Sequence, residues 1–214
     1  MLEIQVFTFN PFMENTYLVF DESKECLIID PGMLEKREEQ ELVDFIDSRG
    51  LKPVRLLNTH CHIDHIWGNR FVHEHYQLPL EAPEEELFNL TDTKRWTEQL
   101  GVPEPNSPLP KTYLKGGDVI KFGNEQALEA LFTPGHSPGH LSFYHETSKI
   151  VIAGDALFQG SIGRTDLPGG DFDTLIQSIK EKLFVLDNDV KVYPGHGPYT
   201  TIGFEKDQNP FFAR

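Results

Sequence analysis

Four side chains that commonly bind metal ions fall within six positions of the chain: His60, His62, Asp64 and His65. They follow residues 54–58, an apolar run that predicts a buried β-strand. Along an extended backbone, side chains two positions apart share a side, so His60 and His62 can converge on one ion. The chain then turns toward an expected helix over residues 66–76, so Asp64 and His65 face elsewhere and suit a neighbouring ion. The spacing therefore predicts two adjacent metal sites.

Three further candidate ligands share one kind of setting. Each follows an apolar, β-rich segment and a short run of small residues: His136, Asp155 and His196. In layered α/β folds, functional residues gather at the edge of the sheet where loops follow strands. We therefore expect all seven side chains to meet at one such edge and to hold two ions.

Imidazole and carboxylate donors indicate a catalytic metal centre rather than a structural one. This donor set suits zinc and also iron or manganese, whereas an all-thiolate site would indicate structural zinc. Two ions about 3.5–4 Å apart can lower the pKa of a shared water, present it as hydroxide and polarise the carbonyl that it attacks. We expect two divalent metal ions, with zinc as the first choice and iron or manganese as alternatives. Asp64 is the expected catalytic residue, because its carboxylate can orient the nucleophile and accept a proton.

Four histidines lie outside the ligand pattern. His140 follows the candidate ligand His136 by four residues, and we expect it to support the ligands or to pack behind them. The other three, His73, His75 and His145, are expected to be solvated.

The order of the elements predicts an α/β fold built from two halves. Strands are expected near residues 2–8, 16–20 and 26–30. A charged helix over 34–49 should follow them and end at Gly50. A second helix should begin at Asp171, a candidate N-cap, because apolar residues recur after it at helical spacing. Strands in both halves with helices outside make a four-layer αββα sandwich.

The chain of 214 residues can bury one substantial core, so we expect a single domain spanning residues 1–214. Residues 81–111 are the least regular part, with an acidic beginning and a proline-rich end. They are expected to form a helical and proline-rich insertion that roofs the active site, packs in a dimer or covers the sheet edge. No separate C-terminal helical domain is expected, because the chain ends shortly after His196.

The formal net charge is −15, and two divalent ions, with four positive charges, would bring it to about −11. Such an acidic surface repels phosphate backbones, which disfavours a nuclease and any nucleic-acid partner. The sequence shows no signal-peptide pattern and no run that could span a bilayer, so no membrane partner is expected. The two cysteines, Cys26 and Cys61, are expected to be buried thiols in a cytoplasmic protein. The oligomeric state stays open.

The motifs together resemble those of the metallo-β-lactamase superfamily and, within it, of the glyoxalase II-like hydrolases. The seven candidate ligands stand in the order found in that family. Further matching runs are Ile29-Asp30-Pro31-Gly32, Thr133-Pro134-Gly135-His136-Ser137-Pro138-Gly139-His140, Gly154-Asp155 and Gly163-Arg164-Thr165-Asp166. The likeness spans nearly the whole chain and implies the αββα sandwich of the metallo-β-lactamase fold.

The resemblance also implies how the ligands would be shared between the two ions. One ion would be held by His60, His62 and His136. The other would be held by Asp64, His65 and His196. Asp155 and a water or hydroxide would bridge them.

The implied activity is hydrolysis of a small acyl thioester, such as S-2-hydroxyacylglutathione (S-lactoylglutathione), by attack of a metal-bridging hydroxide. Arg164 matches a basic position that helps to bind glutathione in glyoxalase II enzymes, so it is the expected substrate-binding residue. Asp166 and Pro198 stand where that family has tyrosines, and the C-terminal helical domain that contributes to glutathione binding is missing. These departures indicate weaker recognition of glutathione.

Other functions remain open on the sequence. The segment Gly163-Arg164-Thr165-Asp166-Leu167 also looks like the corresponding segment of iron-dependent persulfide dioxygenases, which use one iron with three protein ligands. Lactonases and other ester hydrolases of the superfamily use the same centre on different substrates. A non-enzymatic metal-binding module is disfavoured, because every candidate ligand is present and buried carboxylates are costly without their ions.

Overall fold

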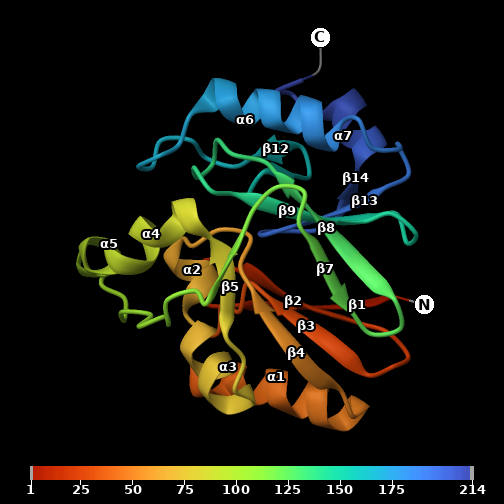
Figure 1. The fold of residues 1–214 in the computed structure, drawn as a ribbon. Helices are drawn as coiled ribbons and strands as arrows, with labels where there is room; N and C mark the ends of the chain where they lie inside the picture. Colours follow the sequence, from red (N-terminus) through yellow and green to blue (C-terminus); the bar gives the residue numbers. More distant parts are fainter. Residues whose placement is uncertain (1, 213–214) are drawn as a thin grey trace. The chain divides into compact units, whose positions relative to one another are not determined.

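The computed structural model describes residues 2–212, which form two compact units along the chain (Figure 1). The first unit comprises residues up to 114 together with 121–126, and the second comprises 115–120 and the residues from 127 onward. Each unit contains a six-stranded sheet. No helix within residues 2–212 is long and apolar enough to cross a membrane. That these units make one domain stays a prediction.

The sheet of unit 1 runs in the order β1-β2-β3-β4-β5-β6. Its strands are β1 (Glu3–Phe9), β2 (Glu14–Phe20), β3 (Glu25–Ile29), β4 (Lys52–Leu57), β5 (Leu80–Pro83) and β6 (Thr112–Leu114). The first three strands are antiparallel, and β3 to β6 are parallel. The carboxyl ends of these parallel strands are where the sequence places its first ligand cluster, immediately after β4.

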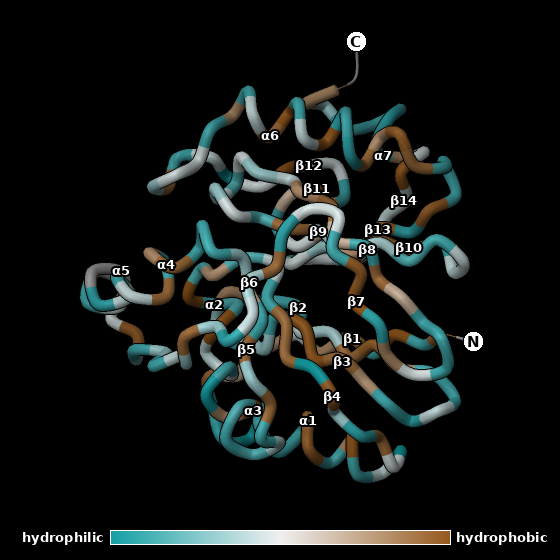
Figure 2. Tube along the Cα trace, in the orientation of Figure 1, coloured by the Kyte–Doolittle hydropathy of each residue, from teal (hydrophilic) through white to brown (hydrophobic). Residues whose placement is uncertain are grey.

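The helices of unit 1 are α1 (Lys36–Arg49), α2 (Ile63–Ile66), α3 (Asn69–Tyr76), α4 (Leu87–Thr91) and α5 (Thr93–Leu100), with a 3₁₀ helix over Glu84–Glu86. The expected helix over 34–49 is confirmed as α1. It begins with a capping box between Glu35 and Glu38 and ends at Gly50, which has the left-handed φ of 61° that glycine tolerates. Figure 2 shows hydrophilic and hydrophobic residues mixed along α1, whose buried positions include Leu42 and Ile46.

The helix expected over residues 66–76 is confirmed in its larger part as α3, which begins only at Asn69, while α2 is a separate helical turn that ends at Ile66. The break lies at Trp67 and Gly68, where the Gly68 N–H donates to the carbonyl oxygen of Pro31 at 2.7 Å. A Cβ at Gly68 would lie 2.8 Å from that same oxygen. The close approach of a second backbone, rather than any helical pattern, therefore sets the chain direction here.

Unit 2 contains most of the second sheet, whose order is β14-β13-β10-β9-β8-β7 and in which only the β10–β13 pair is parallel among the pairings described. Its strands are β7 (Val119–Phe122), β8 (Gln126–Phe132), β9 (Leu141–His145), β10 (Ile150–Gly154), β13 (Lys191–Pro194) and β14 (Thr200–Thr201), with a separate hairpin of β11 (Leu157–Phe158) and β12 (Ser161–Ile162). Its helices are α6 (Phe172–Ser178), a π-helix over Ile179–Leu183, and α7 (Ile202–Gln208). Asp171 caps α6 as expected, since its side chain accepts a hydrogen bond from the Thr174 N–H.

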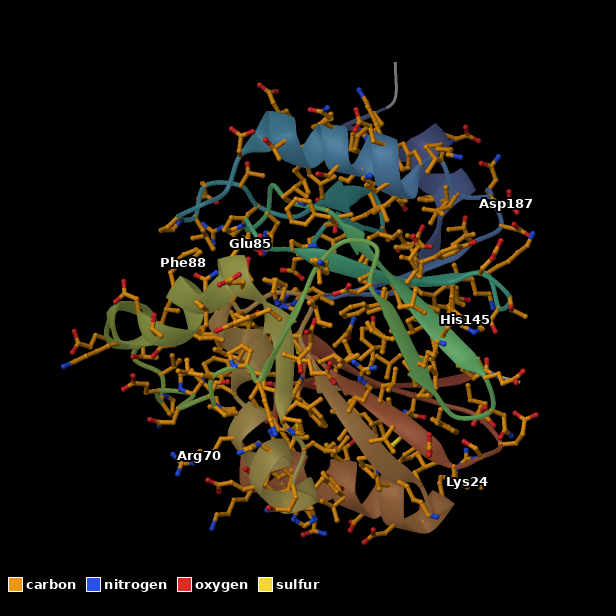
Figure 3. The ribbon with its side chains drawn as sticks, in the orientation of Figure 1. Lys24, Arg70, Glu85, Phe88, His145 and Asp187 are labelled. Atoms are coloured by element: carbon orange, nitrogen blue, oxygen red, sulfur yellow. The ribbon has the colours of Figure 1, made fainter. Side chains whose placement is uncertain are left out.

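The region expected to be an insertion at about 81–111 begins inside β5 and ends just before β6. Its acidic beginning forms the 3₁₀ helix and α4, where Figure 3 labels Glu85 and Phe88. The proline-rich stretch after α5 lacks helix and strand until the Lys111 N–H donates to the Leu80 carbonyl at 2.9 Å. The region is thus the connection between two paired parallel strands.

Candidate metal centre

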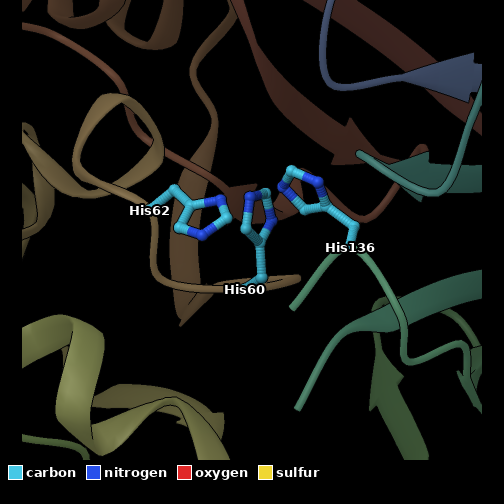
Figure 4. Close-up of side chains that lie close together, drawn as sticks. All are labelled: His60, His62 and His136. Carbon is cyan, nitrogen blue, oxygen red and sulfur yellow. The ribbon is translucent and has the colours of Figure 1, made fainter. Parts of the chain in front are cut away.

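Three imidazole rings gather at the turn that follows β4 in unit 1. The ring centroids of His60 and His62 are 4.8 Å apart, and the rings meet edge to face, as Figure 4 shows. The centroids of His60 and His65 are 4.2 Å apart. Because β4 already ends at Leu57, the histidines converge through an irregular turn rather than through the strand alternation that the sequence suggested.

Asp30, immediately after β3, stabilises this turn through hydrogen bonds. Its carboxylate accepts the Thr59 N–H at 2.7 Å and the Thr59 hydroxyl at 2.6 Å. The same carboxylate lies 3.2 Å from Nδ1 of His65. Nδ1 therefore carries the proton, and Nε2 is the His65 atom presented for metal binding. The Nε2 atom lies 3.7 Å from Oδ2 of Asp64.

Glu14, on β2, is a buried carboxyl group that sequence reasoning missed. The Thr16 hydroxyl donates to its Oε2 at 2.9 Å, and its Oε1 lies 3.8 Å from Nδ1 of His65. Burial raises the pKa of Glu14 well above its usual value, and the nearby His65 opposes that rise. No motif in the sequence marks this residue, since only the fold brings β2 against residues 58–65, the turn that carries the candidate ligands (the ligand turn).

Asp155 in unit 2 lies between two histidines. Its Oδ2 is 3.5 Å from Nε2 of His136 and 3.6 Å from Nε2 of His196. These distances exceed those of ordinary hydrogen bonds. An ion bound at about 2.0–2.2 Å from two ligand atoms holds them roughly 3.3–3.6 Å apart at a tetrahedral angle. The spacing therefore suits a carboxylate oxygen that shares metal ions with both imidazoles.

The backbone of residues 163 and 164 supports His136, which Figure 4 also draws. Nδ1 of His136 donates to the carbonyl oxygen of Arg164 at 2.8 Å, which leaves Nε2 to face Asp155. A Cβ at Gly163 would lie 1.8 Å from the Asp155 carbonyl oxygen and 3.0 Å from Nδ1 of His136. Only glycine fits at position 163. The hydrogen bond to the Arg164 carbonyl could not be predicted from the sequence, because any residue type carries a backbone carbonyl.

His140 has the supporting role that its position suggested. It is fully buried, and its Nε2 accepts the Asp155 N–H at 3.0 Å. Its Nδ1 therefore carries the proton and donates to the Thr133 hydroxyl at 2.8 Å. A neutral imidazole thus fixes the backbone of the residue that lies between the two histidines.

The Arg164 side chain is paired with Asp166. Nε and Nη2 of the guanidinium each donate to the carboxylate at 2.7 Å, and both side chains are exposed. The hydrogen bonds from Arg164 lower the pKa of Asp166 to about 2. Because exposed ion pairs contribute little free energy, an anionic ligand can compete for this guanidinium. Binding of substrate by Arg164 stays a prediction.

The remaining histidines are not all solvated. His75 is exposed and His73 is half-buried, with its Nδ1 2.6 Å from the Leu78 carbonyl oxygen. The expectation was wrong for His145 on β9, which Figure 3 labels and which is buried. Its Nδ1 accepts the Ser148 N–H at 3.1 Å, and burial lowers its pKa. A neutral imidazole can accept this hydrogen bond and so stabilise the turn between β9 and β10. No spacing in the sequence indicates this role.

The two cysteines are free and buried, as expected. Both belong to the hydrophobic core of unit 1, so the Cys61 side chain packs into that core although its neighbours are candidate ligands. Burial raises the pKa of Cys26 to about 12 and that of Cys61 well above its usual value. Both thiols therefore stay protonated and do not compete for metal.

Comparison with known proteins shows the family of the chain. The family model described as the metallo-beta-lactamase superfamily matches residues 9–196. Hydroxyacylglutathione hydrolase GloC of Haemophilus influenzae is 36% identical over 212 residues, which cover 98% of both chains.

Three solved structures are similar over nearly the whole chain. The B3 metallo-beta-lactamase BLEG-1 is 33% identical with a TM-score of 0.91, and the match covers 99% of this chain and 100% of that one. TTHA1623, solved in a di-iron-bound form, is 37% identical with a TM-score of 0.86 and coverage of 97% and 99%. ETHE1 from Myxococcus xanthus is 25% identical with a TM-score of 0.81 and coverage of 99% and 84%. The chain belongs to the metallo-β-lactamase superfamily of metal-binding hydrolases and has the α/β fold of that family, as its motifs predicted.

Proposed function

We propose that the protein is a binuclear metal-dependent thioesterase of the glyoxalase II type, with S-2-hydroxyacylglutathione as its substrate class. The observation that carries this proposal is the match to a hydroxyacylglutathione hydrolase across 98% of both chains at 36% identity. The donor sets within each unit support it, because their imidazoles and carboxylates suit divalent ions and no thiolate competes.

In this proposal His60, His62 and His136 hold one ion. Asp64, His65 and His196 hold the other, and Asp155 contributes to both. When bound, two such ions lower the pKa of water toward neutrality and polarise the carbonyl group of the substrate. Zinc is our first choice for the native metal, and the di-iron-bound form of TTHA1623 supports iron as the main alternative.

The residues of the chain have distinct tasks. Asp30 and the Arg164 carbonyl hold the Nδ1 protons of His65 and His136, so that each presents Nε2. Asp64, whose side chain is 16% exposed while His65 is fully buried, can accept a proton from water that enters the site. The Arg164 guanidinium would exchange Asp166 for a carboxylate of the glutathione moiety.

The deciding experiment is hydrolysis of S-D-lactoylglutathione by purified protein, with metal content measured on the same sample. We expect turnover with close to two ions per chain, loss on chelation and recovery when metal is returned. His62→Ala should abolish turnover, whereas the matched variant His75→Ala, at an exposed histidine of α3, should not change it.

The same samples should be tested with a lactone and with the β-lactam nitrocefin, because the similar protein BLEG-1 is a metallo-beta-lactamase. If protein with a filled metal site hydrolyses one of these compounds but no glutathione thioester, that class of compound would replace the glutathione thioester as the proposed substrate. That result would leave the metal-dependent hydrolysis intact.

A mononuclear iron persulfide dioxygenase is the second candidate. The segment at residues 163–167 and the similarity to ETHE1 from Myxococcus xanthus favour it. A single iron per chain, with oxygen uptake on addition of glutathione persulfide and no thioesterase turnover, would establish this alternative.

A further inference from the structure

A buried glutamate on the β5–β6 connection contacts the ligand turn of unit 1. Residues 84–86 are three consecutive glutamates, of which the first two are exposed and Glu86 is fully buried. Oε2 of Glu86 accepts the backbone N–H of Cys61 at 3.0 Å and the amide of Asn89 at 2.8 Å. Burial of a carboxylate is costly unless hydrogen bonds compensate it, so this contact has a structural purpose.

The position of the accepted N–H makes the contact specific. Cys61 lies between His60 and His62, and the N–H that Glu86 accepts belongs to the peptide that joins Cys61 to His60. On the other side of His60, the carboxylate of Asp30 accepts the Thr59 N–H at 2.7 Å. Two carboxylates from distant segments therefore fix alternate N–H groups of one irregular turn, where no sheet partner is available to do so.

The same connection also reaches the end of the ligand cluster. The amide of Asn69 donates to the Ser107 hydroxyl oxygen at 2.9 Å and to Oδ1 of Asn58 at 2.7 Å. The Asn58 amide in turn donates to the carbonyl oxygen of His65 at 3.0 Å. Residues of the proline-rich stretch are thus connected through two amides to the backbone of a candidate ligand.

We propose that Glu86 is a positioning residue for metal binding, which acts through the Cys61 N–H to hold His60 and His62 in the geometry of a ligand pair. This inference rests on the ligand assignment in the proposed function. Without an acceptor, the N–H of Cys61 is buried and unsatisfied, and the turn rearranges to find another partner. Loss of a group that orients metal ligands weakens metal binding by about 10–100-fold.

Binding of cobalt(II), measured by competition with a chelating dye and by its visible d–d absorption, tests this role without any substrate. Glu86→Leu should bind cobalt at least about tenfold more weakly and with an altered spectrum. Glu86→Gln should retain the wild-type spectrum and an affinity within about threefold of wild type, because its amide oxygen still accepts the Cys61 N–H.

Glu81→Leu is the matched control. Glu81 is another largely buried glutamate of the same region, but its carboxylate pairs with Arg55, at 2.7 Å from Nε, rather than with the ligand turn. Its replacement should lower the melting temperature and leave the cobalt spectrum and affinity unchanged. If Glu86→Leu does not fold, Asn89→Ala, which removes another hydrogen-bond donor to the Glu86 carboxylate, should weaken cobalt binding by more than about threefold.

Wild-type cobalt affinity and spectrum in both Glu86→Leu and Asn89→Ala would overturn the inference, as would an equal loss in Glu81→Leu. Equal losses in Glu86→Gln and Glu86→Leu would also overturn it, because the acceptor would then not be the cause. Wild-type protein that binds no cobalt at all would instead contradict the proposed metal ligands.

Discussion

At the scale of single residues, the carboxylate of Asp155 lies between the two candidate ligands His136 and His196 of unit 2. One of its oxygens is 3.5 Å from His136 and 3.6 Å from His196, while its backbone N–H is held by His140. The residue is therefore flanked by two candidate ligands at its carboxylate and held by a neutral imidazole at its backbone. A change of charge at this position should affect the metals before it affects the fold.

We expect Asp155→Asn to lose metal and to reduce hydrolysis by at least about a hundredfold, because a neutral amide cannot stabilise two shared cations as a carboxylate does. Metal analysis and turnover of S-D-lactoylglutathione on one preparation measure both effects. Asp173→Asn, at an exposed aspartate of α6, is the matched control and should behave as wild type. Full metal content in Asp155→Asn would contradict the sharing of this carboxylate.

Gly163 gives a second prediction at this scale. Gly163→Ala places a methyl group where the Asp155 carbonyl oxygen is 1.8 Å away, so the backbone of one of the two segments must move. Overpacking of this kind costs about 1–3 kcal/mol of unfolding free energy. Urea unfolding should show that loss, and metal analysis should show that less metal is retained. An unchanged midpoint and metal content would show that the segments yield easily.

The sequence marks candidate ligands more clearly than it marks the groups that support them. Histidine and aspartate at close spacing have few structural explanations, so the candidate ligands stand out. Glu14, Glu86 and the Arg164 carbonyl have ordinary sequence neighbours, and their roles depend on segments that meet only after folding. The same reason explains the wrong expectation for His145, whose burial follows from its place on β9.

At the scale of elements, cap residues located the ends of helices better than helical composition did. Gly50 and Asp171 end and begin their helices where local chemistry requires. The run over 66–76 has helical composition, yet Gly68 packs closely against the Pro31 backbone and α3 begins only at Asn69. When two distant backbone segments approach this closely, the only sign of the contact in the sequence is a glycine.

The cap of α6 predicts a dependence of stability on pH. Hydrogen bonds from Thr174 lower the pKa of Asp171 below its usual value. The carboxylate therefore stabilises the folded state fully above an unfolded-state pKa of about 3.9, and this contribution is lost as the pH falls through the lower folded-state pKa.

We accordingly expect Asp171→Ala to unfold at lower denaturant than wild type at pH 7, and the difference should shrink below about pH 4. Asp171→Asn keeps the cap without the titration, so it should stay near wild type at pH 7. Unfolding midpoints of the three proteins across this range give the result. A difference between Ala and wild type that is constant with pH would show that the charge has no part in the cap.

At the scale of the whole molecule, the order of motifs predicted the fold class although many element boundaries were only approximate. The reason is that several strands along the chain are each followed by candidate ligands. Few folds can bring the ends of all these strands together. The net charge of −15 adds a consequence for stability, because the carboxylates among the candidate ligands would lie close together without compensating cations when metal is removed.

Removal of metal should therefore lower the melting temperature. A ligand present at about a hundred times its Kd contributes about 2.7 kcal/mol to the folded state, which for a chain of this size is a shift of roughly 5–10 °C. Scanning calorimetry before and after chelation, and again after zinc is returned, measures it. An unchanged melting temperature would indicate that the folded protein binds the ions no more tightly than the unfolded chain, which would contradict the proposed ligands.

The burial of the two thiols gives the protein a built-in reporter of local opening. Cys26 and Cys61 both belong to unit 1, and residues 115–120 and 127–214 contain no cysteine. An alkylating reagent under native conditions can reach these sulfur atoms only when unit 1 opens, so the rate of alkylation reports the opening equilibrium of that half alone. Placing one cysteine at the buried Val192 in a variant without the native thiols would report the other half. The two rates together would show which half of the molecule unfolds first.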